Sequence, residues 1–152
     1  MHTKVLIPLD GSESAEAAVD EAVAFASSVK SVHLISVEAS SVRMRQLEGF
    51  AFYAERYTAV RRQAGLDYLL PFKEKLEAAG LEVSVSVEFG DSLPVIAESV
   101  RRDRIGLVIL GGSGSGWLER HTGMARYARR LARKVGATIL TVQPKDKLAP
   151  AA

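Results

Sequence analysis

Short apolar runs alternate with segments of helical periodicity along the chain, and this alternation restricts the possible folds more than any other feature. The apolar runs lie at residues 4–9, 32–38, 81–89, 105–110 and 137–142. Most of them lack the polar alternation of a half-exposed strand, which favours a parallel sheet covered by helices. The sequence therefore predicts the α/β class: a five-stranded parallel sheet with helices on both faces, in a Rossmann-like three-layer sandwich.

The segments between these runs carry the spacing of helices. The expected helices cover residues 15–29, about 57–79, 95–102 and 124–135. The longest of them contains Pro71, which is expected to kink or interrupt it. Its inward-facing residues are expected to be Val60, Ala64, Tyr68 and Phe72. Residues 41–56 fit either an extension of this helix or a mobile flap.

The size of the chain, 152 residues, suits one domain with a single core. We expect this domain to cover residues 1–144 and the tail at 145–152 to be disordered. No apolar run reaches the length of about 18 residues that a membrane span needs, and the first residues lack the pattern of a secretory signal. A cytoplasmic location without a membrane partner is therefore expected. Cysteine is absent, which excludes disulfides and thiolate ligands.

A loop rich in glycine and serine, GGSGSG at residues 111–116, follows the fourth apolar run. In an open parallel sheet, ligands bind beyond the carboxyl ends of the strands, near the point where the strand order reverses. Residues 8–11 also follow a strand end, so the two loops are expected to face each other across a crevice. Glycine amides and serine hydroxyls can bind phosphates, and the Asp10 carboxylate can bind a ribose hydroxyl or a base amine. A flexible connection is the alternative interpretation of the loop.

Known catalytic and metal-binding motifs are missing from the sequence. The glycine loop has no P-loop lysine, the first unit has no GxGxxG motif, and no histidine pair has the spacing of zinc ligands. Ser12 and Ser14 lie close to Asp10, but no GxSxG motif is present, so we expect these serines to cap the first helix. We therefore assign no catalytic residue and no metal ligand.

The net charge of +2 gives no support for a nucleic-acid partner, although the expected last helix has a basic face. This face contains Arg126, Arg129, Arg130 and Arg133. The opposite face, expected to be buried, contains Met124, Ala128, Leu131 and Val135. Aromatic residues are not interleaved with the arginines, which favours a solvated surface. His33 lies inside an expected strand, at an edge or partly buried.

Several segments together resemble the universal stress protein family. They are VLIPLDGSESA at 5–15, Ser-Val at 36–37, GDSLPVIAES at 90–99 and LVILGGSGSG at 107–116. The resemblance implies an adenine-nucleotide-hydrolase-like α/β sandwich that forms a homodimer through its last strand. It also implies a regulatory protein of the stress response that binds ATP or another adenine nucleotide, with or without magnesium, and hydrolyses ATP slowly at most. The alternative is a family member that binds no nucleotide and acts as a dimeric protein-interaction module.

The resemblance also places the nucleotide site at the carboxyl ends of the first, second and fourth strands. It implies that Pro8 and Asp10 flank the base and the ribose, and that the Val37 backbone binds the adenine edge. The candidate nucleotide-binding residues are Pro8, Asp10, Val37, Gly111, Ser113, Gly114, Thr122 and Gly123.

The phosphate end of the family motif, G-x2-G-x9-G-[ST], is only partly matched. Gly111 and Gly114 fit its first two positions, whereas Gly123 comes one residue early and is followed by Met124 instead of a hydroxyl residue. Thr122 could supply a hydroxyl from a shifted register. The departure weakens the case for a bound triphosphate more than the case for an adenosine group.

Overall fold

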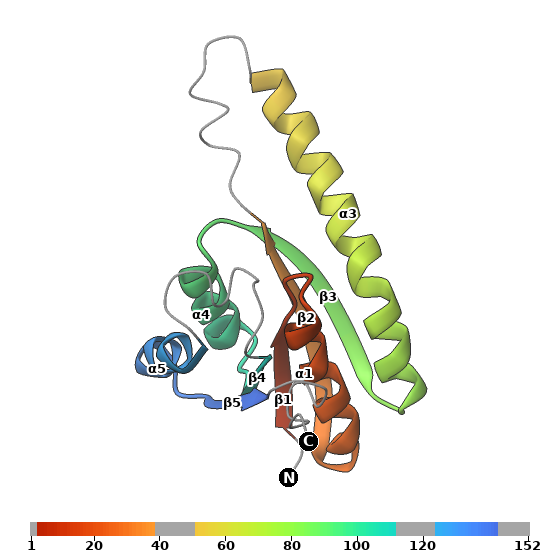
Figure 1. Ribbon diagram of the computed structural model, residues 1–152, viewed down its shortest axis with the longest axis vertical. Coiled ribbons are helices and arrows are strands. Elements are labelled where there is room, and N and C mark those ends of the chain that lie inside the picture. The colour runs from red at the N-terminus through yellow and green to blue at the C-terminus, as the bar shows by residue number, and fades with distance from the viewer. Residues whose placement is uncertain (1–2, 39–50, 112–123, 143–152) are drawn as a thin grey trace, which may run out of the picture.

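The computed structural model describes residues 3–38, 51–111 and 124–142, and these residues form a single parallel sheet flanked by helices (Figure 1). The strands are β1 (Thr3–Pro8), β2 (Val29–Glu38), β3 (Glu82–Phe89), β4 (Leu107–Gly111) and β5 (Thr138–Val142). The helices are α1 (Glu13–Ala24), the 3₁₀ turn η1 (Ala26–Ser28), α3 (Ala51–Ala78), α4 (Ser92–Arg102) and α5 (Met124–Lys134). All neighbouring strands are parallel, in the order β3-β2-β1-β4-β5. The predicted α/β class and five-stranded sheet are confirmed.

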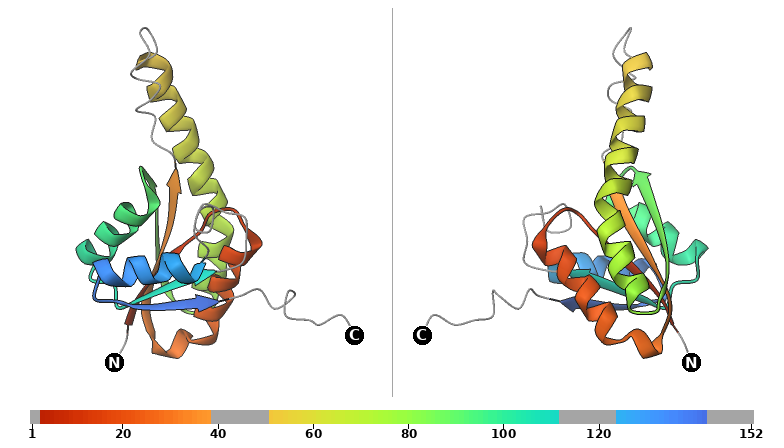
Figure 2. Two further views of the ribbon diagram at one scale, coloured as in Figure 1. Left: turned by 60° about the vertical axis from the view of Figure 1, so that its left-hand side comes forward. Right: turned by 90° about the vertical axis from the view of Figure 1, so that its right-hand side faces the viewer.

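The sheet separates two apolar cores, because successive residues of a strand point to opposite faces. Val5 and Ile7 of β1 pack with α1 and α3, whereas Leu6 packs with α4 and α5. Figure 2 shows the two pairs of helices on opposite sides of the sheet. The three layers of the predicted sandwich are therefore present.

Helix α3 differs from the prediction at Pro71, because the helix continues through this residue without interruption. Proline lacks an N–H, so the carbonyl of Asp67 loses its partner within the helix. Both residues are exposed, and water can bind the carbonyl instead. Residues 51–56 belong to the helix, so the helical extension is confirmed for this part, while residues 39–50 lie outside the described chain.

The buried face of α3 also differs from the prediction. Val60 is 66% exposed, whereas Leu69 and Leu76 are fully buried against the sheet. Figure 1 gives the reason, since the first half of α3 extends beyond the sheet and only the second half lies on it. Tyr68 and Phe72 are partly buried, as expected, but Ala64 is exposed.

Gly65 allows α3 to lie close to β3. A Cβ atom at this position would be 2.7 Å from Cγ2 of Val87, which is closer than real Cβ contacts. The contact positions the second half of α3, including Tyr68, over the sheet.

The first helix is shorter than the predicted 15–29, whereas α4 and α5 differ from the prediction by three residues or fewer at each end. Helix α1 ends at Ala24 and is followed by η1, so β2 begins at Val29. Helix α4 begins at Ser92, with Pro94 in its first turn, where a missing N–H costs no helical hydrogen bond. Within the described residues, no helix is both long and apolar enough to cross a membrane.

Candidate functional site

The strand order reverses between β1 and β4, and this reversal defines the candidate site. The chain runs outward from β1 through β2 to β3, then crosses to β4 on the other side of β1. At such a point the connections leave the carboxyl ends in opposite directions and open a crevice. Pro8, Asp10, Val37 and Gly111 lie at or just beyond these carboxyl ends, so the structure brings four predicted residues to one edge. Ser113, Gly114, Thr122 and Gly123 lie outside the described residues.

The backbone of Val37 faces this crevice. The N–H of Leu9 donates to the carbonyl of Ile35 at 2.9 Å, so the peptide groups of Ile35 point toward β1. Backbone groups alternate in direction along a parallel strand, and those of Val37 therefore point the same way. The register of β1 with β2 ends at Pro8 and Ile35, and no described strand pairs with Val37 on this side. One donor and one acceptor are thus presented side by side above the end of β1.

Asp10 is held in place by the start of α1. Its Oδ1 accepts the N–H of Ser12 at 3.0 Å and the hydroxyl of Ser12 at 2.6 Å. The same hydroxyl oxygen accepts the N–H of Ala15 at 3.1 Å and caps the helix. The predicted capping role of Ser12 is confirmed, whereas the side chain of Ser14 is outside the described atoms. The result is a half-buried carboxylate fixed at the crevice.

Tyr68 supports the same loop from α3. Its hydroxyl accepts the N–H of Gly11 at 3.0 Å and donates to Oε2 of Glu16 at 3.0 Å. Burial, with the neighbouring Glu16 carboxylate, raises the pKa of Tyr68, so the phenol remains a neutral donor. Gly11 adopts φ +84°, a conformation that glycine accepts at low cost, and the hydrogen bond from its N–H helps to fix this turn.

The sequence analysis did not identify Tyr68 as part of a site. Its partner Gly11 is 57 residues away, so only the packing of α3 on the sheet brings the two together. The helical spacing that placed Tyr68 on an inward face is the one sequence signal that points to it.

An ion pair, a hydrogen bond and a cation–π contact connect α3 to the ends of β2 and β3. Arg61 binds the Glu38 carboxylate at 2.6 Å, and Arg62 donates to the carbonyl of Val87 at 2.9 Å. The guanidinium of Arg62 lies 5.1 Å from the ring centre of Phe89. These contacts are largely exposed, so each contributes little stability, but together they position α3 beside the crevice.

Met124 begins α5 and packs against the apolar core beneath α4 and α5. The position where the resemblance implies a phosphate-binding hydroxyl therefore contributes to packing. Tyr127, which the sequence analysis did not place in the core, is buried there and donates to Oγ of Ser92 at 2.9 Å. Burial raises the pKa of Tyr127 to about 12.

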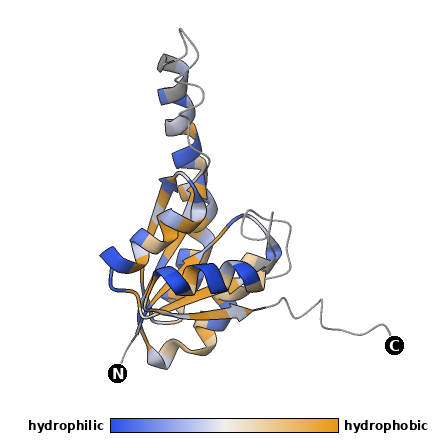
Figure 3. Ribbon diagram, turned by 90° about the vertical axis from the view of Figure 1, so that its left-hand side faces the viewer, coloured by the Kyte–Doolittle hydropathy of each residue, from blue (hydrophilic) through white to orange (hydrophobic). Residues whose placement is uncertain are grey.

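The basic face of α5 is exposed at all four arginines, as expected for a solvated surface. Figure 3 shows α5 as strongly hydrophilic beside largely hydrophobic strands. Its buried side contains Tyr127 and Leu131, with Met124, Ala128 and Val135 partly buried around them. Within the described ranges, no three histidine, aspartate or glutamate side chains gather as metal ligands would.

The sheet order defines a doubly wound α/β protein. A sequence profile of the universal stress protein family matches residues 1–143. The chain belongs to the universal stress protein family. No curated protein matches its sequence significantly.

Solved structures support the fold. The hypothetical protein MJ0577 superposes with a TM-score of 0.76 at 22% identity, covering 95% of this chain and 98% of its own. A universal stress protein family protein from Arabidopsis thaliana, solved with AMP bound, gives a TM-score of 0.64 at 20% identity, with coverage of 98% and 96%. A universal stress protein solved in complex with cAMP gives a TM-score of 0.60 at 19% identity, covering 93% of this chain and 97% of its own.

Proposed function

We propose that this universal stress protein binds an adenine nucleotide, ATP or AMP, in the crevice at the carboxyl ends of β1, β2 and β4. The observation that carries the proposal is the pair of Val37 peptide groups that extend past the end of β1. A purine presents a donor and an acceptor on neighbouring ring positions, so it matches such a pair. Two structural relatives hold AMP or cAMP, which supports a ligand of this class.

The residues around Val37 fit the remaining parts of a nucleoside. Pro8 is buried at the end of β1 and offers an apolar surface for a base. The Asp10 carboxylate is fixed by Ser12 through Oδ1, which leaves Oδ2 for a ribose hydroxyl. Gly111 ends β4 on the other side of β1, where a backbone without a side chain admits a phosphate.

We propose that adenosine provides most of the binding free energy and the terminal phosphates little. Met124 packs in the core at the position where the family motif implies a hydroxyl. ATP and AMP should therefore bind with similar affinities. We assign the protein a regulatory role in which the nucleotide biases its interactions.

Isothermal titration calorimetry with ATP, AMP and adenosine tests the proposal, after a denatured sample has been examined for nucleotide carried through purification. The expected result is saturable binding of all three ligands with affinities within about tenfold of each other, which corresponds to about 1.4 kcal/mol. Absence of binding, with no carried nucleotide in the denatured sample, would contradict it.

A homodimeric interaction module is the second candidate function, and the edge of β5 favours it. In the described sheet β5 pairs with β4 alone, and Thr138 and Thr141 are exposed. An open edge strand is a ready surface for pairing with a second copy. Light scattering should give the mass of a dimer, and Thr141→Lys should shift the equilibrium to monomer. A wild-type monomer at high concentration would exclude this arrangement.

A further inference from the structure

The face of the sheet that α4 leaves open is polar along β2 and β3. His33 of β2 bonds to two serines of β3, with Nδ1 2.6 Å from Oγ of Ser84 and Nε2 2.7 Å from Oγ of Ser86. Parallel strands covered by helices are normally apolar on both faces. This part of the sheet instead presents hydroxyls and an imidazole, so its chemistry is that of a surface that contacts water or a polar ligand.

A cavity of about 640 Å³ lies over this polar surface. It is lined by Lys4, Ser31, His33, Ser84, Arg102, Asp103, Arg104 and Ile105. Lys4, Ser31 and Ser84 lie in the first half of their strands, so the cavity is at the amino end of the sheet, opposite the nucleotide crevice. The cavity therefore does not belong to the site described above.

The charge around the cavity is positive. Lys4, Arg102 and Arg104 contribute cations, and Asp103 is the one acid in the lining. The guanidinium of Arg102 donates to the Asp103 carboxylate at 3.2 Å. This hydrogen bond and the positive charge of Arg102 lower the pKa of the Asp103 carboxyl, so Asp103 is charged and paired with Arg102. Two cations remain in excess, and an anionic group is the ligand that would neutralise them.

Arg104 has a backbone conformation that favours glycine. Its φ is +54°, and it is the one described residue other than glycine with positive φ. It follows α4, where the N–H of Ile105 donates to the carbonyl of Val100 at 3.0 Å, the bonding pattern of a glycine C-cap. Glycine would remove the strain, so an arginine here indicates that its side chain contributes something else.

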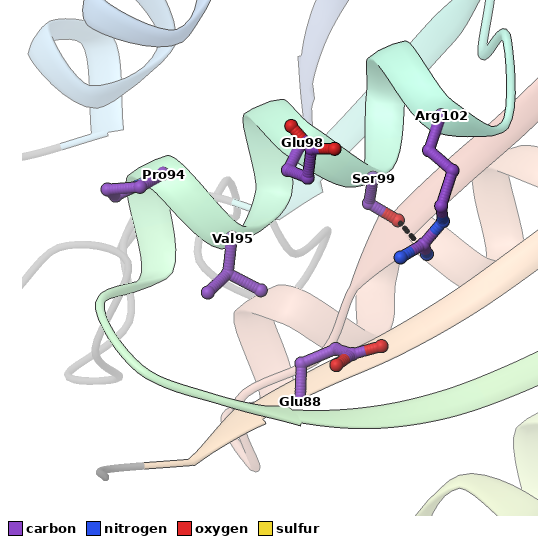
Figure 4. Close-up of a pocket in the computed structure, with 6 residues that line it drawn as sticks. All are labelled: Glu88, Pro94, Val95, Glu98, Ser99 and Arg102. Carbon is purple, nitrogen blue, oxygen red and sulfur yellow. Dashed lines mark hydrogen bonds between the residues drawn. The ribbon is translucent and has the colours of Figure 1, made fainter.

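A second, smaller cavity of about 250 Å³ continues along α4 and shares Arg102 with the first. Figure 4 shows its lining, with Ser99 and Arg102 of α4 directed toward Glu88 of β3 and with Glu98 on the same helix. The carboxylates of Glu88 and Glu98 would repel an anion in this smaller cavity. The place that suits an anionic group is therefore the larger cavity, among Lys4, Arg102 and Arg104, where neutral polar groups of a ligand could reach the serines.

We propose that the cavity at the amino end of the sheet binds a small phosphorylated molecule that carries hydroxyl groups. Arginine guanidinium groups form paired hydrogen bonds with phosphate oxygens, and Lys4 adds a point charge. The hydroxyls of Ser31 and Ser84 can donate to or accept from the hydroxyls of the ligand, while His33, bonded through both ring nitrogens, fixes the Ser84 hydroxyl. The volume is sufficient for a sugar phosphate.

Calorimetric titration with glucose 6-phosphate, inorganic phosphate and glucose tests this proposal without any adenine nucleotide. Glucose 6-phosphate should bind with one site per chain, inorganic phosphate more weakly, and glucose not measurably. Absence of saturable glucose 6-phosphate binding, or equal affinity for glucose, would overturn the proposal. Equal affinity for inorganic phosphate would overturn the role of the hydroxyl-binding residues.

Arg104→Gly separates ligand binding from stability. The variant should unfold at the wild-type temperature or above, because glycine relieves the positive φ, yet bind glucose 6-phosphate about tenfold more weakly. Arg104→Lys should keep most of the affinity for glucose 6-phosphate. Arg130→Gln is the control, because Arg130 is an exposed residue of α5, and this variant should bind glucose 6-phosphate as the wild type does. Unchanged affinity in Arg104→Gly would contradict the proposal.

Ser84→Ala tests the hydroxyl-binding surface. It should weaken glucose 6-phosphate binding about fivefold and leave inorganic phosphate binding unchanged, because a single neutral hydrogen bond is removed. An equal effect on both ligands would show that Ser84 does not discriminate between them. These experiments are independent of nucleotide binding, so failure at either edge of the sheet leaves the other proposal intact.

Discussion

The two ends of the sheet offer binding surfaces of different construction. At the carboxyl end, the candidate nucleotide crevice is built mainly from backbone groups, with the peptide of Val37, the turn at Gly11 and the end of β4 at Gly111. At the amino end, the cavity is built from side chains, with three cations around serines and an imidazole. A backbone site follows from the strand order, which the fold fixes, whereas a side-chain site depends on the residues of this particular chain. Changes at one end should therefore leave binding at the other unchanged.

The largest effect is expected for Gly65→Val, because a side chain here collides with Val87. Overpacking of this kind should lower the free energy of unfolding by about 1–3 kcal/mol and shift α3 with Tyr68. Ala64→Val, one residue earlier on the exposed side, is the matched control and should cost about 0.5 kcal/mol. Urea unfolding measures both. Equal stability of the two variants would show that α3 does not need the close approach.

Asp10→Ala should weaken adenosine and AMP binding by about 1–3 kcal/mol, the cost of losing a hydrogen bond to a charged group. Asp20→Ala, which removes an exposed carboxylate from the same helix region, should leave the affinity unchanged. Glucose 6-phosphate binding should be unaffected in both. Unchanged adenosine affinity in Asp10→Ala would remove this carboxylate from the site.

Tyr68→Phe should have a smaller effect, since it removes the hydrogen bonds to Gly11 and Glu16, of which only the first reaches the Asp10 loop, and keeps the ring against Phe72. Gly11 is exposed, so water can replace the lost acceptor, and AMP affinity should fall by about 1 kcal/mol. Tyr57→Phe, an exposed position on α3, is the control. If the two variants bind AMP equally, Tyr68 does not position the Asp10 loop.

Met124→Ser should increase ATP affinity more than adenosine affinity, by about threefold, because one neutral hydrogen bond is worth about 1 kcal/mol at most here. Met124→Leu keeps the apolar packing and should leave the ratio of the two affinities unchanged. An equal change for ATP and adenosine in Met124→Ser would separate this position from the phosphates.

The smallest expected effect is the dependence of stability on pH through His33. Burial lowers the pKa of this imidazole below 6.5, with Asp103 opposing and Arg102 adding to the shift. The contribution of neutral His33 to the free energy of unfolding is complete above pH 6.5. It is lost as the pH falls below this value, because the imidazole binds a proton more readily in the unfolded chain than in the folded one. His33→Gln should therefore flatten the pH dependence of the unfolding free energy below pH 6.5. The same slope in both proteins would contradict the shift.

Much of the fold could be predicted from the sequence because strands and helices differ in their periodicity. All five strands lie where the apolar runs predicted them. The errors are in α3, whose first half extends past the sheet (Figure 1), so Val60 is exposed although it has the spacing of a buried residue. Helical spacing identifies a face, and only the packing of the helix decides how much of that face is covered.

The candidate sites differ in the same way. Asp10 and Gly111 follow apolar runs and Pro8 lies near the end of one, so the rule for parallel sheets places them at one edge before any coordinates are known. The amino-end cavity joins β1, β2, β3 and the end of α4, and no sequence spacing connects these elements. The positive φ of Arg104 could not be predicted from the sequence either, because an arginine two residues after a helix does not indicate a left-handed backbone.

The most direct test of the nucleotide proposal is a titration of isotope-labelled protein with AMP, followed by the backbone amide signal of Val37 in NMR spectra. We expect the Val37 amide signal to show one of the largest shifts in the spectrum, and the Gly11 amide signal to shift with it. The titration curve of both signals should give the dissociation constant measured by calorimetry. Signals at the amino end of the sheet, including Lys4 and Ser84, should stay in place. Saturable AMP binding that leaves the Val37 amide unmoved would contradict the assignment of the crevice as the adenine site.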